Sequence, residues 1–447
     1  MPAFFLPLDP SLALIVLIFA QVVLPIASIL TGLYFIVIFL SAPFRPRRKL
    51  PEGEPRLRIL TLIPCRNEEA LISGLWENLN QVNYPRHLID FTVIADNCTD
   101  QTAERAREAG FTVLVRHDLS GQSKAHALNW AFYDQGLLNA DYDAVSILDA
   151  DTRLDPDFFL YVESYLRRGS KIVQGNRIAI NPGQSVFSAA MSIIYSFESR
   201  LWHVPHANKG LSVTMMGTGC TIACDHLRLI GWDIRTLVED CEFSIQSVLA
   251  GSSVQYCDQA HCYTELPSTL RMLWRQLRRW FSGHIACGRF YLPALWQKYR
   301  RDKGGHASIF IVTLIIPFTC TLGLLQLALS VVALWDLLGG RRSLTGILTG
   351  ILINQIAGML AALFVLLMDG RLNREQLRLV WKGVLCFPYW SIFLGVIYLT
   401  SFIKPMKKWV PMEHQAVLPE TTGISGDSSA HRFSSLKTPK HSRRKRR

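Results

Sequence analysis

The stretch that decides the fold is Ala144-Val145-Ser146-Ile147-Leu148-Asp149-Ala150-Asp151-Thr152-Arg153. Its apolar part, Val145 to Leu148, has the length of a short buried strand and runs directly into two carboxylates. In open α/β sheets ligands bind where strands end, so Asp149 and Asp151 are expected at a binding crevice. Two carboxylates beside a nucleotide diphosphate suit Mg²⁺ or Mn²⁺, which complete their coordination with phosphate and water. Taken alone, an Asp-x-Asp is more often a solvated acidic turn.

Three strands are predicted before this stretch, each followed by a polar loop or a helix. They cover Leu57 to Ile63, Phe91 to Ala95 and Phe111 to Val115. The alternation of strand and helix predicts an α/β domain with a mostly parallel sheet and helices on both faces. The first strand is followed by Asn67, Glu68 and Glu69, and the second by Asp96. Because parallel strands end at one edge of a sheet, these side chains should share an anionic, nucleotide-sized crevice with Asp149.

Two common kinds of nucleotide-binding loop are absent from the sequence. No Gly-x-Gly-x-x-Gly follows the first strand and no Gly-Lys-Ser/Thr occurs, which disfavours dinucleotide oxidoreductases and P-loop NTPases. Lys124 begins a predicted helix, where it is either a phosphate or base contact or an ordinary surface lysine. Gly217 and Thr218 lie in a turn where backbone can approach a ligand closely. Asp240, after Glu239, is either a helix cap or, if it faces the crevice, a candidate general base.

The composition indicates a protein that lies partly in lipid. Hydrophobic residues make up 49% of the 447 residues, and the formal net charge is +12. The segment from Lys404 to Arg447 carries eleven Lys and Arg against three acidic residues, so the remainder is only mildly basic and nucleic-acid binding is not indicated. The ten cysteines could include a zinc site at Cys220/Cys224 and Cys257/Cys262, but idle thiols of a reduced compartment are favoured.

Long apolar segments predict several membrane crossings. The run from Leu12 to Leu40 exceeds the roughly 20 residues that span a bilayer. Basic residues follow it, which disfavours a cleaved signal peptide and places the next residues in the cytoplasm. Three further segments cover Ile309 to Leu338, Leu344 to Met368 and Leu379 to Ile403. Three crossings would put the basic tail outside, so either the tail breaks the positive-inside rule or one segment, with Leu377 to Pro388 the suspect, is partly interfacial.

Ahead of these segments, Ser268 to Ile285 has the pattern of a basic amphipathic helix on a membrane surface. Gln276, Arg279 and Trp280 share one face of it. An arginine there can pair with a diphosphate leaving group, and a tryptophan can offer its ring to a sugar. A helix merely lying on anionic lipid would explain the arginines but not the grouped Gln and Trp.

As an ordered set, these motifs resemble the membrane-bound family 2 glycosyltransferases, especially the processive branch of cellulose, hyaluronan, chitin and poly-N-acetylglucosamine synthases. The motifs are Asn67-Glu68-Glu69, Asp96, Lys124 before Ala-x-Ala-Leu-Asn, Asp149-Ala150-Asp151, Glu239-Asp240 and Gln276-x-x-Arg279-Trp280. The resemblance covers residues 57 to 285 and is specific as a set, although each member is weak alone. It implies a GT-A type domain and a hexosyltransferase-type enzyme that transfers a sugar, with inversion and a metal, from a nucleoside-diphosphate sugar such as a UDP-sugar.

The resemblance also implies roles for individual residues. The nucleotide-sugar site would include Asn67, Glu68, Glu69, Asp96, Lys124, Asp149, Asp151 and Arg279. Asp149 and Asp151 would hold the diphosphate, with Asp151 most directly on Mg²⁺ or Mn²⁺. Asp240 would be the base, beside Glu239, and the acceptor contacts would be Gly217, Thr218, Gln276 and Trp280. One departure is Asn97, where many relatives carry a second acidic residue, and it bears on polymer synthesis more than on sugar transfer.

The predicted organisation is that of a multi-pass cell-membrane protein with its catalytic domain in the cytoplasm. Its parts are an N-terminal transmembrane helix (1–44), the GT-A domain (45–265), interface helices with the Gln-x-x-Arg-Trp motif (266–305), about three transmembrane helices (306–404) and a basic disordered tail (405–447). Expected partners are a UDP-sugar, membrane lipids, accessory export subunits and either a growing polysaccharide or a lipid-linked acceptor of a single sugar. A transporter or scaffold is disfavoured because the closing segments carry few polar residues.

Overall fold

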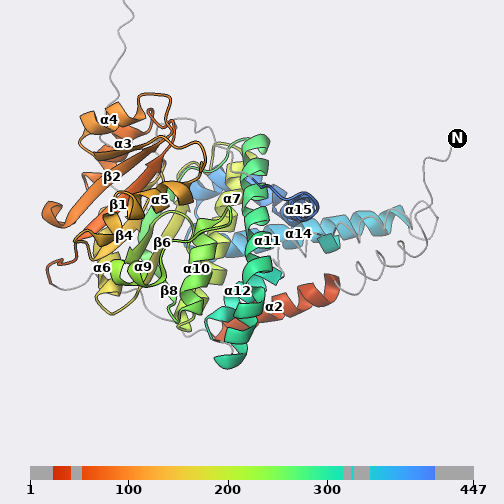
Figure 1. Ribbon diagram of the computed structural model, residues 1–447. Helices are drawn as coiled ribbons and strands as arrows, with labels where there is room; N and C mark the ends of the chain where they lie inside the picture. Colours follow the sequence, from red (N-terminus) through yellow and green to blue (C-terminus); the bar gives the residue numbers. More distant parts are fainter. Residues whose placement is uncertain (1–23, 42–52, 304, 316–323, 327–342, 408–447) are drawn as a thin grey trace, which may run out of the picture.

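The structure is a computed structural model that describes residues 24–41, 53–303, 305–315, 324–326 and 343–407 (Figure 1). Its centre is an eight-stranded sheet in the order β3-β2-β1-β4-β7-β6-β8-β5. The strands are β1 Ile59–Cys65, β2 Ile89–Asp96, β3 Thr112–Arg116, β4 Ala144–Ile147, β5 Arg153–Leu154, β6 Ile172–Ala179, β7 Cys220–Ala223 and β8 Val254–Thr264. The four strands predicted from the sequence therefore form within about two residues of their expected ends.

The sheet is mixed, and the prediction of a mostly parallel sheet holds for all its strands except β7 and β5, which run in the opposite direction. Strands β3, β2, β1 and β4 are parallel neighbours. Strand β7 then runs antiparallel to both β4 and β6, β6 pairs in parallel with β8, and β5 is antiparallel to β8. Gly217 and Gly219 have φ angles of +81° and +64°, a region that favours glycine, and they lead the chain into β7 in the reversed direction.

Helices cover both faces of the sheet, as the sequence predicted. They are α3 Ile72–Leu79, α4 Thr102–Ala109, α5 Lys124–Tyr133, α6 Phe158–Leu166, α9 Cys224–Ile230 and α10 Glu239–Leu249, with short 3₁₀ turns η2 Arg86–Leu88 and η3 Leu137–Asn139. Alternate residues of β1 point to opposite faces: Ile59 and Ile63 join a core with α3, α4 and α6, whereas Leu60 and Leu62 join a second core with α5, α9 and α10.

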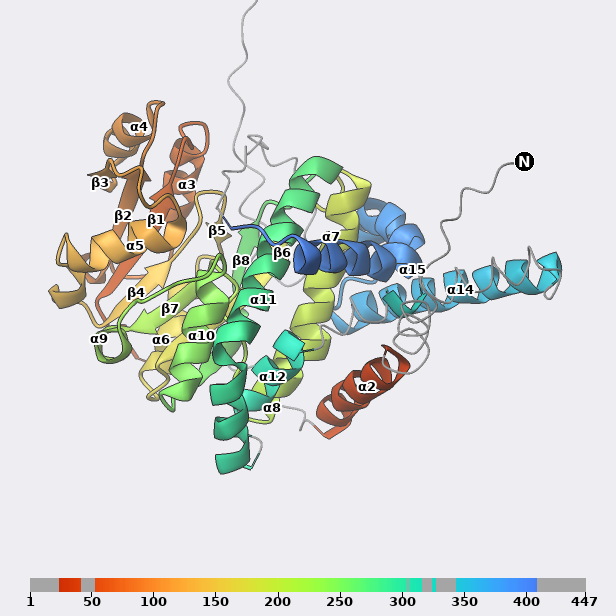
Figure 2. The same ribbon diagram turned by 45° about the vertical axis from the view of Figure 1, so that its right-hand side comes forward.

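The remaining helices lie on one side of the sheet. They are α2 Leu24–Ser41, α7 Val186–Phe197, the π-helix η4 Glu198–His203, α8 Val204–Asn208, α11 Leu270–Arg301, α12 Ala307–Ile315, α14 Leu344–Met368 and α15 Arg374–Ile403. Helices α7, η4 and α8 follow one another without a break, and this stretch contacts α2, α14 and α15. Figure 2 shows α2 and α14 projecting away from the sheet, while α15 lies against α7.

Buried ion pairs fasten the apolar helices to η4. Arg200 donates from Nη1 to Asp258 at 2.7 Å and from Nε to Asp369 at 2.6 Å, and Ser196 also donates to Asp369 at 2.6 Å. Asp369 directly follows α14, and its side chain is 4% exposed. The turn between α14 and α15 is therefore held against the helix that borders the sheet.

Within the described residues, two helices are long and apolar enough to cross a membrane: α14 and α15. Helix α15 contains the suspected segment Leu377 to Pro388, and its Gly383 packs on the backbone of Ala189 in α7. Most of the predicted crossing at Ile309 to Leu338, the start of the Leu12 to Leu40 run and most of the basic tail lie outside the described residues, although α12 includes the beginning of that crossing.

Candidate active site

A cavity of about 460 Å³ lies where β1, β2 and β4 end, and α7, η4, α10, α11 and α15 complete its wall. Most of the predicted site residues line it. They are Glu68, Asp96, Lys124, Asp149, Asp151, Gly217, Thr218, Glu239, Asp240, Gln276, Arg279 and Trp280. Segments that are more than 200 residues apart in the chain therefore meet in one place.

Asn67 and Glu69 do not line the cavity and instead fasten two neighbouring loops. The Asn67 side chain accepts a hydrogen bond from the backbone of Thr99 at 2.8 Å and donates to its hydroxyl at 3.1 Å. Glu69 accepts from the backbone of Gln101 at 3.0 Å. These contacts hold the loop after β1 against the loop after β2. The nucleotide contact predicted for the two residues stays a prediction.

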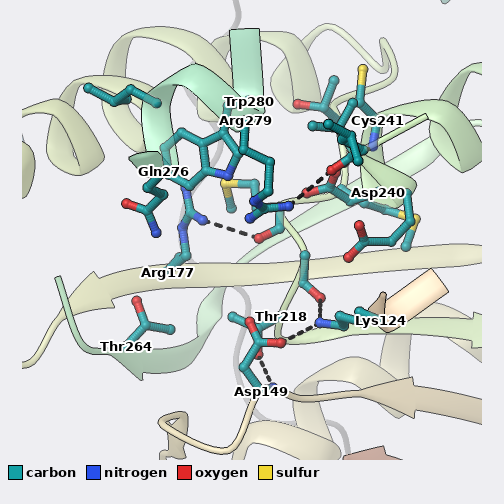
Figure 3. Close-up of a pocket in the computed structure, with 18 of the residues that line it drawn as sticks. Lys124, Asp149, Arg177, Thr218, Asp240, Cys241, Thr264, Gln276, Arg279 and Trp280 are labelled. Carbon is teal, nitrogen blue, oxygen red and sulfur yellow. Dashed lines mark hydrogen bonds and ion pairs between the residues drawn. The ribbon is translucent and has the colours of Figure 1, made fainter. Parts of the chain in front are cut away.

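Lys124 is placed by a helix cap. The Ser123 side chain accepts from the backbone of His126 and so fixes Lys124 as the first residue of α5. Its ammonium donates to Asp149 and, at 2.8 Å, to the carbonyl oxygen of Gly217 (Figure 3). Burial lowers the pKa of Lys124, but the carboxylates of Asp149 and Glu239 outweigh burial and raise it above its usual value. Lys124 is therefore charged at neutral pH.

Thr218 supports the Asp149 loop from beneath. Its hydroxyl accepts from the backbone of Asp149 at 3.0 Å and lies 2.8 Å from the hydroxyl of Thr152. The Thr218 residue is 2% exposed. The turn that contains Asp149 and Asp151 is therefore held in place by the loop that precedes β7.

The loop after β2 is held together by the side-chain amide of Asn97. Asp96 accepts hydrogen bonds from Arg116 at 2.7 Å and from the Asn97 amide at 2.8 Å. The same amide donates to the carbonyl of Asp118 at 3.0 Å and accepts from its backbone at 2.9 Å. Burial raises the pKa of Asp96, opposed by Arg116. A carboxylate at position 97 could make none of the amide's donations.

Glu239 and Asp240 form the first turn of α10. Burial and the neighbouring Asp240 raise the pKa of Glu239. Burial also raises the pKa of Asp240, against the backbone bond from Cys241 and the cations Arg279, Lys124 and Arg177. A Cβ on Gly217 would lie 3.4 Å from Asp240 Oδ2, which is an ordinary van der Waals distance, so the φ angle of +81° and not crowding favours glycine here.

Helix α11 brings its motif to the far side of the cavity. Thr269 caps the helix, and Arg279 donates to the carbonyl of Leu237 at 3.0 Å, which ties α11 to the start of α10. Figure 3 shows Gln276, Arg279 and Trp280 on the side opposite Lys124 and Asp149.

Residues 55–283 match the sequence model of a protein family described as "Glycosyltransferase like family 2". The chain is a family 2 glycosyltransferase. The prediction of a glycosyltransferase enzyme is confirmed. Relatives include a probable glycosyltransferase, YdaM, of Bacillus subtilis, which is 25% identical over 53% of this chain and 58% of its own length. Another is a poly-beta-1,6-N-acetyl-D-glucosamine synthase of Staphylococcus aureus, 29% identical over 50% of this chain and 54% of its own length.

The transferase thus spans little more than half the length of these relatives. Among solved structures, the mannosyltransferase PcManGT of Pyrobaculum calidifontis, in complex with GDP-Man and Mn²⁺, is similar with a TM-score of 0.54 and 17% identity. The match covers 85% of this transferase and 97% of that chain. The predicted GT-A type α/β fold is confirmed, with a mixed sheet.

Arg177 and Glu198 of this transferase are site residues that sequence reasoning missed. Arg177, on β6, donates to the carbonyl of Met216 at 3.1 Å and to Glu198 at 3.4 Å, and its guanidinium lies 4.0 Å from the ring centre of Tyr195. Both residues line the cavity. A single charge within an otherwise uncharged strand was the only sequence signal for Arg177.

The donor set of the transferase fits the predicted cation. Asp149 and Asp151 both line the cavity. Among the described residues no group of three or more His, Cys, Asp or Glu side chains could hold a metal, so the predicted cation would also need ligands that the protein does not supply. Two carboxylates suit an ion that takes its other ligands from phosphate and water, as Mg²⁺ and Mn²⁺ do.

Proposed function

We propose that this transferase moves a hexosyl group, with inversion, from a UDP-sugar to a glycan acceptor beside a membrane. One observation carries the proposal: a single cavity contains Asp149, Asp151 and Lys124 at one end and Asp240 with the Gln276-x-x-Arg279-Trp280 face at the other. Charged side chains from distant segments that meet in one cavity are typical of a binding site for a charged substrate, and less typical of groups that only stabilise the fold.

The donor would bind at the end formed by β2 and β4. Asp149 and Asp151 would hold Mg²⁺ or Mn²⁺, which neutralises charge on a diphosphate leaving group. Lys124 would bind the same diphosphate from this end, and Arg279 would reach it from the opposite wall of the cavity. Glu68 and Asp96 would face the nucleoside. The mannosyltransferase of similar fold was solved with GDP-Man and Mn²⁺, which motivates these assignments.

Asp240 would act as the general base. Its raised pKa makes it a stronger proton acceptor than an exposed aspartate, while Arg279, Lys124 and Arg177 oppose the rise and favour the ionised form. It would take the proton of the acceptor hydroxyl as that oxygen attacks the sugar carbon and the diphosphate leaves from the opposite face. Trp280 and Gln276 would orient the acceptor ring, with Gly217 and Thr218 supporting the loop beneath.

The membrane organisation completes the proposal. The catalytic domain would lie in the cytoplasm between an N-terminal crossing that includes α2 and the crossings at α14 and α15, with α11 at the lipid surface. Membrane lipids and export subunits would be its partners. A second candidate function is transfer of a single sugar to a lipid-linked acceptor. It is favoured by the apolar helix α15, which reaches the cavity with Trp390 and Leu394.

The deciding experiment measures UDP release by membranes that contain the enzyme, across a panel of UDP-sugars. The poly-N-acetylglucosamine synthase relative makes UDP-N-acetylglucosamine the first donor to test. Product length, from one radiolabelled donor, then separates a polymer from a single adduct. Absence of sugar-dependent UDP release with every donor would contradict the proposal.

A further inference from the structure

Several buried polar atoms on the Trp280 side of the cavity have no hydrogen-bond partner. Among the described residues these include Arg177 Nε, His203 Nδ1, Gln276 Oε1 and Trp390 Nε1. All four residues line the cavity. Buried polar groups are almost always paired in folded proteins, so several unpaired atoms around one cavity indicate a ligand or water that pairs them.

The chemistry of these atoms restricts the ligand. Arg177 Nε and Trp390 Nε1 can only donate a hydrogen bond, whereas the Gln276 amide presents an oxygen that can only accept one. A phosphate oxygen without a hydrogen satisfies donors alone. A hydroxyl group both donates and accepts, so a ligand with several hydroxyl groups satisfies all of these atoms.

The charge on this side of the cavity also disfavours an anion. The guanidinium of Arg177 is paired with Glu198, whose carboxylate would repel a negative ligand. His203 adds no positive charge, because burial, His206 and Arg177 lower its pKa to about 3. Arg177 and Glu198 therefore offset each other, and the remaining cation of the described residues on this side, Arg279, interacts with the acidic side chains of Glu239 and Asp240.

Aromatic rings frame the same region. Arg177 lies 4.0 Å from the ring centre of Tyr195 and 5.8 Å from that of Trp280. Trp280 and Trp390 belong to one hydrophobic cluster, although they come from α11 and α15. Flat aromatic faces beside hydrogen-bonding groups suit pyranose rings, whose faces carry C–H groups and whose edges carry hydroxyls.

We propose that Arg177, Glu198, His203 and Trp390 form a hydroxyl-binding wall for an uncharged acceptor glycan, and that Trp390 donates to a sugar behind the terminal one. This inference rests on the proposed function and deepens it, because it selects a neutral glycan over a lipid phosphate as acceptor. The wall includes the π-helix η4, whose Glu198 and His203 face the cavity while Arg200 anchors it from the other side.

The test compares two Trp→Phe substitutions in the full-length enzyme. Trp390→Phe removes the unpaired N–H and keeps an aromatic ring. Trp274→Phe is the matched control, because Trp274 also contacts Phe393 and belongs to the same cluster but does not line the cavity. With neutral β-linked N-acetylglucosamine oligomers as acceptor probes, Trp390→Phe should raise the acceptor KM about three- to tenfold and Trp274→Phe should not. The Kd for UDP should stay within about twofold in both.

The product provides the second readout. Wild-type product from UDP-N-acetylglucosamine should be a water-soluble glycan stable to mild acid. An organic-soluble product whose sugar is released by mild acid would be a glycosyl phosphate, and it would overturn the hydroxyl-binding wall while leaving sugar transfer intact. Equal acceptor KM values for the two tryptophan variants would overturn it as well. Failure of the proposed function has a different signature, namely the absence of sugar-dependent UDP release by the wild-type enzyme with every UDP-sugar.

Discussion

Lys124 joins two loops of the active site, since its ammonium donates both to Asp149 and to the carbonyl oxygen of Gly217. The loop after β4 and the loop before β7 thereby share one partly buried cation.

Replacement of Lys124 by Met should weaken UDP binding. The substitution removes a charge-assisted donor from the diphosphate end of the cavity, so we expect the Kd for UDP, measured by calorimetry, to rise about 10- to 100-fold. Lys171→Met is the control, because Lys171 also pairs with an aspartate, Asp225, but on the exposed surface. An unchanged Kd in Lys124→Met would remove Lys124 from the donor site.

Asp240→Asn should separate binding from chemistry. The amide keeps the size of the side chain but cannot take a proton, so the transfer rate should fall about 10²- to 10⁴-fold while the Kd for UDP changes little. Asp225→Asn, in an exposed residue of α9, should leave both quantities unchanged. Substantial transfer by Asp240→Asn would exclude Asp240 as the base.

Glu239→Gln should stabilise the protein above acidic pH. Because the folded-state pKa of Glu239 is raised, the native state holds its proton more tightly than the unfolded chain, and stability is lost as pH rises from about 4.5 through the raised pKa. Glutamine removes this loss. The melting temperature of Glu239→Gln should therefore exceed that of the wild type near neutral pH and converge with it below pH 4.5. A difference independent of pH would contradict the assignment.

Asn97→Asp should destabilise the loop after β2. The change removes the amide's donations to Asp96 and to Asp118 and adds a carboxylate beside Asp96, at a cost of about 1–3 kcal/mol. Chemical denaturation of the full chain would measure it. Asn139→Asp, in an exposed residue, provides the comparison. Equal stability of the two variants would show that the amide network contributes nothing.

Asp151→Asn should weaken the binding of Mn²⁺ in the presence of UDP by about tenfold or more, because it removes a carboxylate ligand. Electron paramagnetic resonance reports the bound ion without relying on turnover. Chelation by EDTA should abolish activity, and Mg²⁺ or Mn²⁺ should restore it. Asp141→Asn is the control, since the Asp141 side chain is 96% exposed. Activity that is indifferent to EDTA would contradict the metal role.

The sequence predicted the parallel half of the fold well. Apolar runs that end in polar residues located β1, β2 and β4. Parallel strands end at the same edge of a sheet, so strand direction alone was enough to predict that Asp96 and Asp149 lie close together. The sequence could not predict that β7 lies between β4 and β6 and runs antiparallel to both. That direction depends on a turn in which two glycines have positive φ, and the same residues could adopt many other conformations.

The site was predictable where residues form local motifs and unpredictable where they meet only through packing. Lys124, Asp240 and Gln276 each belong to a short sequence motif that by itself suggests a role in binding or catalysis. Arg177 and Glu198 have no such pattern, because their pairing depends on how α7 and η4 lie across β6. Asn67 has a motif position, yet its side chain serves the neighbouring loop instead of the cavity.

Because Asp369 ties the α14–α15 turn to Arg200 of η4, and Trp390 of α15 reaches the cavity, the apolar helices are structural parts of the active site. A chain shortened after α11 would retain the carboxylates and Lys124 but would lack both of these contributions. Such a truncated enzyme should bind nucleotide with nearly the affinity of the full chain, but its selectivity among acceptors should be altered. Specificity measured on a soluble fragment would therefore misrepresent the intact protein.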